Sequence, residues 1–227
     1  MDNKKINLLI RKSTMYNENT LNFMRNKIKD IITRKIEGDI VECGVWMGGC
    51  SAAIAQTLLA HKDERVLHLF DSFDDICEPL PIDGKKLIKQ VGGIKNAQGR
   101  LRPVKGFYKK RKLSGPGNEK HVHDLLTKIV GYPKEKVKIH KGWFQNTMVP
   151  CSKEIEKIAL LFLDCDLYIS IKLCLENLYS KLSKGGIIMI DDYNNYSGCK
   201  KAVDDFLKEQ KIHVKFNTVD LACWIKK

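Results

Sequence analysis

Several features that would place a protein in a class at once are missing from this 227-residue sequence. No apolar run reaches the roughly 18 residues needed to cross a bilayer, and the first residues, MDNKKINLLIRK, lack the apolar core of a signal peptide. The eight cysteines form no C-x-x-C pair, and several lie in apolar runs, where reduced thiols are usually buried. We therefore expect a cytoplasmic protein without a membrane span or a disulfide framework.

Internal repeats and low-complexity tracts are also absent, and short apolar runs alternate with helical patterns along the chain. This alternation predicts a doubly wound α/β fold, and the length suits one large domain. We expect helices at residues 50–60, 118–130, 169–182 and 197–210. We expect strands at 39–45, 65–71, 136–140, 158–164 and 187–191, with a pair at 212–216 and 221–225 closing the sheet.

Acidic residues are absent from one long stretch. Between Gly84 and Lys112 there are eleven lysines and arginines and no aspartate or glutamate, so the rest of the chain keeps only +2 of the formal charge of +13. Residues 74–118 have no clear period apart from a short helical pattern at 84–91, and so long a segment is often a lid or a binding loop. We expect a basic lid loop at about 74–118. It is either simply a solvated segment or a surface for an anionic partner.

The N-terminal segment, residues 1–37, is expected to be helical in its later part. Asn17 or Asn19 is a candidate N-cap. Apolar residues fall on one face at helical spacing, namely Leu21, Met24, Ile28, Ile31 and Ile32. We expect this segment to contribute to the lid, and residues 38–227 to form the α/β domain.

Two of the apolar runs end in pairs of carboxylates. Asp164 and Asp166 follow one run, and Asp191 and Asp192 follow the next. Such runs suit strands buried in a parallel sheet, and ligands bind at the carboxyl ends of these strands. On a strand, Asp164 and Asp166 would point to the same side, about 6.6 Å apart, whereas Asp191 and Asp192 can converge only beyond the strand end. Four clustered carboxylates favour a hard cation such as Mg²⁺, although single aspartates after strands also cap helices or form turns.

Glycines gather at the first predicted strand-to-helix turn, but not as a dinucleotide fingerprint. The segment from Glu42 to Gly49 is E-C-G-V-W-M-G-G and does not fit G-x-G-x-x-G. The pattern suits a nucleoside-type pocket without a pyrophosphate, because glycine lets the backbone approach a ligand. Asp71 ends the next predicted strand and is placed to accept hydrogen bonds from a ribose diol. A turn with Ser72 is the structural alternative.

Five segments resemble, in order and spacing, the macrocin O-methyltransferase family, the sugar O-methyltransferases of macrolide and aminocoumarin biosynthesis. They are GDIVECGVWMGG, LHLFDSF, KGWFQNT, LLFLDCDLY and LSKGGIIMIDDYNNYSGCKKAVDDF, within residues 12–210. The resemblance implies a Rossmann-like class I methyltransferase fold, with a doubly wound, mostly parallel seven-stranded sheet and an antiparallel C-terminal strand. It also implies S-adenosylmethionine and Mg²⁺ as cofactors and a hydroxyl of a deoxysugar as the methyl acceptor.

The resemblance also assigns roles to residues by motif. It implies that Asp166 is the general base, that Asp164, Asp191 and Asp192 bind the metal, and that Glu42, Gly44, Asp71, Ser72 and Trp143 line the cofactor pocket, with Trp143 near the adenine. The chain departs from the family after D-S-F, where residues 74–81 replace the usual Gly-Leu-Pro, and the loop that follows is more basic. These departures leave the acceptor open.

Three functions are compatible with these observations. The first is S-adenosylmethionine- and Mg²⁺-dependent O-methylation of a deoxysugar or glycan. The basic stretch motivates a nucleic-acid methyltransferase, but neither a D-P-P-Y-type segment nor an aromatic ladder accompanies it. A non-catalytic Rossmann module docking an acidic partner would not explain the acid pairs. We therefore expect a sugar or glycan acceptor rather than nucleic acid, and the sequence leaves open whether the protein forms a homo-oligomer.

Overall fold

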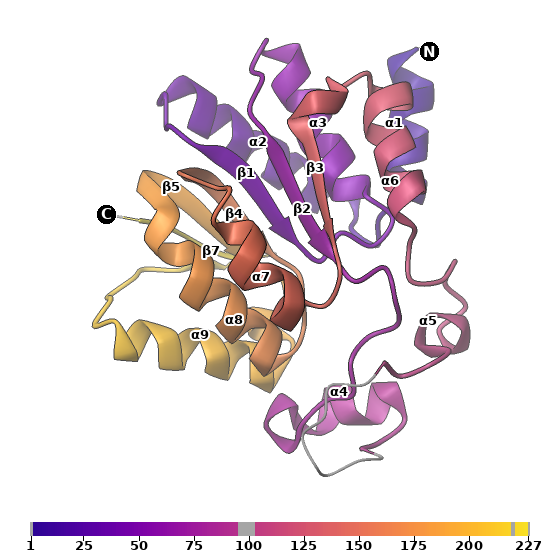
Figure 1. Cartoon of the computed structure of the whole chain (residues 1–227), viewed down its shortest axis with the longest axis vertical. Helices are drawn as coiled ribbons and strands as arrows, with labels where there is room; N and C mark the ends of the chain where they lie inside the picture. Colours follow the sequence, from indigo (N-terminus) through magenta and orange to yellow (C-terminus); the bar gives the residue numbers. More distant parts are fainter. Residues whose placement is uncertain (1, 95–102, 219–220, 227) are drawn as a thin grey trace.

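The computed structural model of the chain describes residues 2–94, 103–218 and 221–226. Seven strands form one sheet in the order β3-β2-β1-β4-β5-β7-β6 (Figure 1). The first five strands are parallel, whereas β7 runs antiparallel to β5 and to the two-residue β6. The predicted doubly wound sheet with an antiparallel C-terminal strand is therefore confirmed. The strands are β1 Asp39–Cys43, β2 Leu67–Asp71, β3 Val137–Lys141, β4 Ile158–Leu163, β5 Leu182–Ile190, β6 Asn217–Thr218 and β7 Ala222–Ile225.

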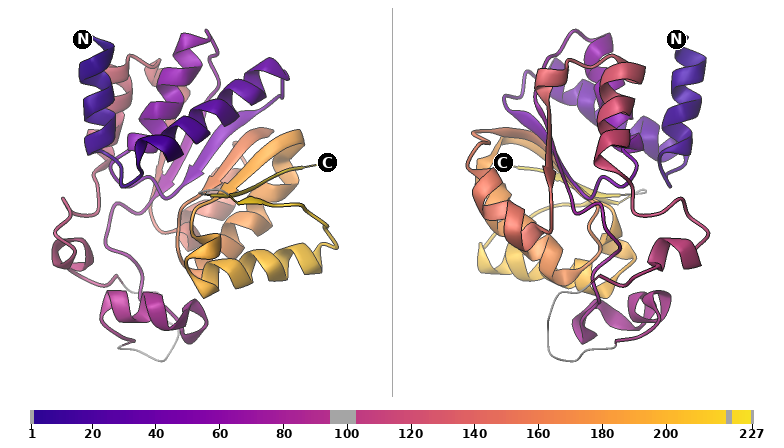
Figure 2. Two further views of the ribbon diagram at one scale, coloured as in Figure 1. Left: turned by 180° about the vertical axis from the view of Figure 1, so that it is seen from behind. Right: turned by 45° about the vertical axis from the view of Figure 1, so that its right-hand side comes forward.

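Helices cover both faces of the sheet (Figure 2). On one side lie α1 Asn3–Lys12, α2 Glu18–Thr33, α3 Gly49–Ala60 and α6 Glu119–Asp124, which continues as a π-helix over Leu125–Val130. On the other side lie α7 Phe144–Ser152, α8 Tyr168–Leu178 and α9 Ser197–Glu209. Short 3₁₀ turns occur at Lys134–Lys136 and Tyr179–Lys181. No helix in the described part of the chain is long and apolar enough to cross a membrane.

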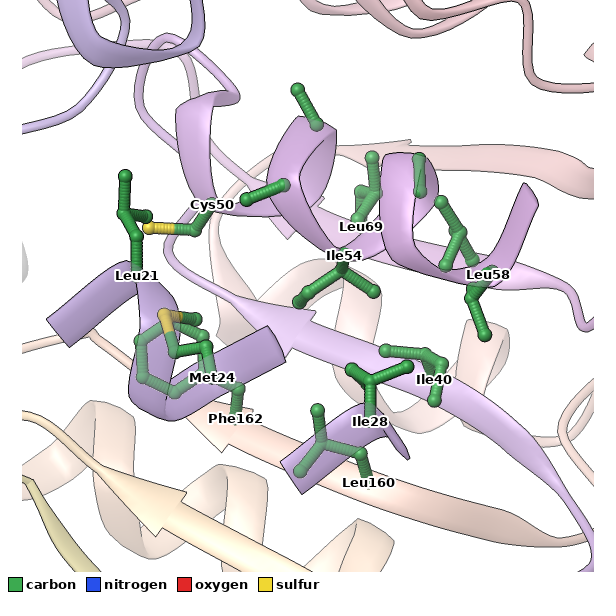
Figure 3. Packing of buried hydrophobic residues seen from close by; sticks show 14 of the residues in the cluster. Leu21, Met24, Ile28, Ile40, Cys50, Ile54, Leu58, Leu69, Leu160 and Phe162 are labelled. Carbon is green, nitrogen blue, oxygen red and sulfur yellow. The ribbon is translucent and has the colours of Figure 1, made fainter. Parts of the chain in front are cut away.

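The apolar stripe predicted in the N-terminal segment is the inner face of α2. Its members pack with Ile54 and Leu58 of α3 onto strand residues such as Ile40 and Phe162 (Figure 3). Complete burial of one such side chain contributes roughly 1.5–3 kcal/mol. The predicted cap is also present, because the Asn17 side chain accepts a hydrogen bond from the Thr20 amide. Helix α1 was not predicted.

Between β2 and β3, residues 74–118 form an insertion whose described part holds the turn η1 Pro81–Asp83 and the helices α4 Gly84–Val91 and α5 Phe107–Lys110. The short helix predicted at 84–91 is confirmed, and residues 95–102 of the predicted lid loop lie outside the described residues. A small apolar cluster of Cys77, Leu87, Val91, Phe107 and Leu167 joins this insertion to the start of α8. The insertion lies beyond the carboxyl ends of the strands (Figures 1 and 2).

One predicted strand is wrong. Residues 212–216 form no strand, and the sheet closes instead with Asn217–Thr218 and β7. Ile212, Val214 and Phe216 do alternate with charged residues and pack against the core. The alternation therefore indicates an extended segment with one side buried. Such a segment does not need a hydrogen-bonded neighbouring strand.

Candidate active site

The carboxyl ends of β1, β4 and β5 meet at the point where the strand order reverses. The ladder continues one residue beyond these strands, since the Asp164 amide donates to the Cys43 carbonyl (2.8 Å) and the Asp191 amide to the Leu163 carbonyl (3.0 Å). Gly44 follows β1 with φ of 93°, and a Cβ there would lie 1.7 Å from the Asp164 carbonyl oxygen. Only glycine therefore allows this close approach of the two strand ends.

A cavity of about 400 Å³ opens at these strand ends, within the size range of small-molecule sites. Its lining includes residues from the α1–α2 turn, the glycine-rich turn after β1, and the insertion. Every site residue predicted from the sequence lines it: Glu42, Gly44, Asp71, Ser72, Trp143, Asp164, Asp166, Asp191 and Asp192. The structure thus brings the two predicted groups of residues into one site.

Three of the carboxylates converge closely enough to share one cation. One oxygen from each of Asp164, Asp191 and Asp192 lies within 4.8 Å of the others. Asp191 and Asp192 converge because β5 has ended and the turn η5 Asp192–Asn194 begins, as predicted. The separation given for Asp164 and Asp166 on an extended strand does not apply, because β4 ends at Leu163 and Asp166 has a left-handed φ of 56°. This turn brings the Asp166 carboxyl group to that of Asp192, with which it hydrogen-bonds.

The four carboxyl groups raise one another's pKa values. Burial is the largest cause, and like charges add to it, so the pKa of Asp192 rises to about 11 and that of Asp191 to about 6. The pKa of Asp164 also lies well above its usual range because of burial and the neighbouring Asp191. Four negative charges therefore cannot coexist in this site without protons or a cation.

Tyr16 is a site residue that the sequence did not reveal. It belongs to the turn between α1 and α2, and its hydroxyl donates to Asp164 Oδ2 at 2.8 Å. Burial and the nearby carboxylates keep its pKa well above the usual value for tyrosine, so the hydroxyl remains a donor. No motif surrounds Tyr16, and its proximity to Asp164 follows only from the packing of α1 and α2.

On the β1–β2 side of the cavity, two buried acids support the glycine-rich turn. Glu42 accepts a hydrogen bond from Ser51 Oγ of α3 (2.5 Å), and burial raises its pKa to about 8. The Asp71 carboxylate accepts hydrogen bonds from three backbone amides, those of Val45 (2.7 Å), Trp46 (2.8 Å) and Phe73 (2.7 Å). Asp71 thus fixes the shape of the turn, and its oxygens are less free for a ligand than the sequence suggested.

The insertion docks onto the same turn and completes the cavity wall. The indole N–H of Trp46 donates to the Gly115 carbonyl (2.7 Å), and its ring stacks on Tyr108 of α5 at 6.4 Å between centroids. Asp75 accepts a hydrogen bond from the Gly106 amide (2.6 Å) at the start of α5. This places Arg111, directly after α5, in the cavity wall.

The sheet order, the glycine-rich turn after β1 and the acids after β4 and β5 define the class: a Rossmann-like class I methyltransferase. The chain belongs to the macrocin-O-methyltransferase (TylF) family, whose model matches residues 10–100 and 118–227. It is therefore an S-adenosylmethionine-dependent O-methyltransferase. Residues 101–117, which include α5 and Arg111, lie outside the match.

Individual relatives agree with this assignment. The chain is 32% identical over 208 residues to demethyldecarbamoylnovobiocin O-methyltransferase of Streptomyces niveus, covering 91% of this chain and 72% of that protein. It is 27% identical over 212 residues to 8-demethyl-8-(2,3-dimethoxy-alpha-L-rhamnosyl)-tetracenomycin-C 4'-O-methyltransferase of Streptomyces olivaceus, with the same coverage. The solved structure of the O-methyltransferase NovP matches with a TM-score of 0.75 and 29% identity, over 95% of this chain and 82% of that one.

Proposed function

We propose that the protein methylates a hydroxyl of a sugar, either a deoxysugar or a glycan, with Mg²⁺ bound by Asp164, Asp191 and Asp192. The observation that carries this proposal is the convergence of one oxygen from each of these three carboxylates within 4.8 Å. The name of the Streptomyces olivaceus relative gives a rhamnosyl-bearing substrate, which supports a sugar acceptor.

The donor set fits a hard divalent cation. All three ligands are carboxylate oxygens, which Mg²⁺ prefers over softer donors. Burial, with a smaller contribution from neighbouring carboxylates, raises the pKa of Asp191 and Asp192, and a bound cation would favour their charged forms. When bound, Mg²⁺ supplies positive charge and a template for two neighbouring hydroxyls of the acceptor. The Tyr16 hydroxyl, bonded to Asp164, holds one ligand in place.

Asp166 is the proposed general base. Its left-handed backbone turns its carboxyl group toward Asp192, and both groups line the cavity. Burial raises the pKa of Asp166, while the hydrogen bond from Asp192 and the charge of Arg111 oppose this rise. A carboxylate in this place accepts the hydroxyl proton as the new O–CH₃ bond forms, and alignment of the hydroxyl with the methyl group contributes most of the acceleration.

The cofactor would occupy the β1–β2 side of the cavity. Gly44 leaves room for close approach to the backbone, and Glu42, Asp71 and Ser72 offer oxygens to hydroxyl and amino groups. Trp143, at the start of α7, offers an aromatic wall for the adenine. The turn after α1 and the insertion also line the cavity, and we assign both the role of a lid.

The test compares Asp164→Asn and Asp191→Asn with Asp30→Asn, an exposed aspartate on α2. Calorimetry should detect S-adenosylhomocysteine binding to all of them, because the first two positions belong to the metal side. Mg²⁺ binding to the cofactor-loaded protein should be lost in Asp164→Asn and Asp191→Asn. Methyl transfer to a panel of deoxysugars should fall by at least about 100-fold in both variants and stay unchanged in Asp30→Asn. Metal-dependent transfer that persists in both site variants would refute the proposal.

A further inference from the structure

The insertion carries positive charge that the rest of the protein does not neutralise. Among the residues that the structure describes, no ion pair is formed by any of its basic side chains, and all of them are exposed: Lys85, Lys86, Lys89, Lys105, Lys109, Lys110, Arg111 and Lys112. Elsewhere on this surface, lysines pair with acids within helices, as Lys201 does with Asp205. Unneutralised charge of one sign beside a cavity attracts a ligand of the opposite sign.

Arg111 brings this charge into the active site. Its guanidinium lies over the ring of Phe107, with Cζ 5.4 Å from the centroid, and Phe107 is buried in the insertion's own apolar cluster. The arginine lines the same cavity as Asp166. A guanidinium held by stacking keeps its five donors free for a bidentate acceptor such as phosphate.

A second cation, on α4, lies close to one residue of the cavity wall. Lys86 Nζ is 5.4 Å from the ring centroid of Tyr196. The Tyr196 ring lines the cavity, and its hydroxyl donates to Gln90 of α4 at 2.8 Å. Lys86 on α4 and Arg111 after α5 therefore place two cations on two different elements of the insertion, and both elements lie beyond the carboxyl ends of the strands (Figure 1).

We propose that Arg111 and Lys86 bind a diphosphate carried by the methyl acceptor, and that the acceptor is a sugar linked to a nucleoside diphosphate. This rests on the proposed sugar methylation. Two cations on separate elements match two linked phosphates better than one carboxylate. The family match leaves out residues 101–117, so the proposed role of Arg111 does not follow from that match.

A nucleic-acid strand fits the same charges less well. Binding of a single strand depends on exposed aromatic rings on which bases stack. In the described part of the insertion, the Phe107 ring is buried and the Tyr108 ring stacks on Trp46. These rings support the protein itself, and the cations lie beside a cavity of about 400 Å³ rather than along a groove.

The test is calorimetric titration of the full chain, saturated with S-adenosylhomocysteine and Mg²⁺, with UDP-glucose, dTDP-glucose and uncharged methyl glucoside. We expect a nucleotide sugar to bind at least about tenfold more tightly than the glucoside. Arg111→Gln and Lys86→Gln should each weaken nucleotide-sugar binding about tenfold. Lys112→Gln removes the same charge beside Arg111, but Lys112 neither lines the cavity, as Arg111 does, nor lies over Tyr196, as Lys86 does, so this substitution should change the affinity less than about twofold.

The inference is overturned if the glucoside binds as well as the nucleotide sugars, if Arg111→Gln leaves their affinity unchanged, or if only RNA or polyphosphate binds, with a steep salt dependence. Affinity for S-adenosylhomocysteine must stay constant across the variants, which also verifies that they fold. If the unmodified protein does not bind S-adenosylhomocysteine, that result counts against the proposed function instead. UDP titrated alone into the protein would then still decide whether Arg111 binds phosphate.

Discussion

Tyr16 connects the N-terminal helices to the proposed metal site by hydrogen bonding. Its hydroxyl donates to Asp164 Oδ2 at 2.8 Å, and its ring packs near Phe162 in the core, at 6.3 Å between centroids. This hydrogen bond fixes one oxygen of the Asp164 carboxylate and so restricts the direction in which the other oxygen can bind a metal ion. Partners of this kind orient metal ligands and affect metal affinity about 10–100-fold.

We therefore predict that Tyr16→Phe weakens Mg²⁺ binding about tenfold while leaving S-adenosylhomocysteine affinity unchanged. The ring and its packing remain, so the protein should stay folded. Tyr168→Phe is the matched control, because the Tyr168 hydroxyl also donates to an aspartate, Asp205 at 3.0 Å, but that aspartate belongs to the outer surface of α9. Mg²⁺ titration by calorimetry gives both affinities, and equal values in the two variants would contradict an orienting role.

The sequence was sufficient to identify the site residues that belong to a recognisable motif. The acid pairs follow buried strands, so the rule that ligands bind at carboxyl ends was enough to place them together. Tyr16 and Arg111 could not be found in this way, because each reaches the site from a turn whose position depends on helix packing. The same limit applies to Asp166, whose left-handed conformation is invisible in a strand pattern.

Among the elements, the turn after β1 has the strictest steric requirement. We predict that Gly44→Ala costs about 2–5 kcal/mol of the free energy of unfolding, since a left-handed alanine costs about 1–2 kcal/mol and the forced contact with the Asp164 carbonyl adds about 1–3 kcal/mol. Gly106→Ala, at the start of α5, separates the two contributions. Its φ is 78°, but nothing lies within 4 Å of the added Cβ, so about 1–2 kcal/mol is expected.

Urea unfolding of the two variants measures both costs. Equal losses of stability would mean that the backbone at Gly44 moves away from Asp164 without penalty. In that case the close approach of β1 and β4 would not be a requirement of the site.

Helices and strands were predicted correctly where the period of the hydrophobic residues and the length of the segment indicate the same type of element. Strands β1 and β2, which carry Glu42 and Asp71, and β4, which ends just before Asp164, were expected within two residues of their observed bounds. Two failures have physical causes. Helix α7 was not predicted, because its sequence contains Pro150 and shows no clear helical period after Trp143. Residues 212–216 alternate because one side packs on the core, although they pair with no strand.

For the molecule as a whole, the edge of the sheet opposite β6 holds a buried chain of titratable groups. On β3, His140 Nε2 lies 3.1 Å from His68 Nδ1 on β2, and His68 Nε2 lies 3.4 Å from an Asp39 oxygen on β1. The His140 ring also stacks on Phe70 at 4.2 Å. Burial and the neighbouring His68 lower the pKa of His140 to about 4.

This shift predicts how stability changes with pH. A histidine in the unfolded chain takes up a proton near pH 6.5, whereas His140 in the folded protein does so only near pH 4. Between these two pH values the unfolded state binds more protons than the folded state. As the pH falls from 6.5 to 4, the free energy of unfolding therefore decreases by about 1.4 kcal/mol per pH unit, roughly 3 kcal/mol in all. Above pH 6.5 this contribution is fully present and no longer depends on pH.

His140→Phe isolates this contribution, because it keeps an aromatic ring on Phe70 and removes the titrating group. The variant loses the hydrogen bond to His68 and should be less stable than the unmodified protein at pH 7. Its deficit should shrink as the pH falls from 6.5 to 4, while the buried acids of the active site affect both proteins alike. Urea unfolding across this range measures the two curves. Parallel curves would show that the pKa of His140 in the folded protein is close to that of an ordinary histidine, and that the surrounding strands tolerate the charged ring.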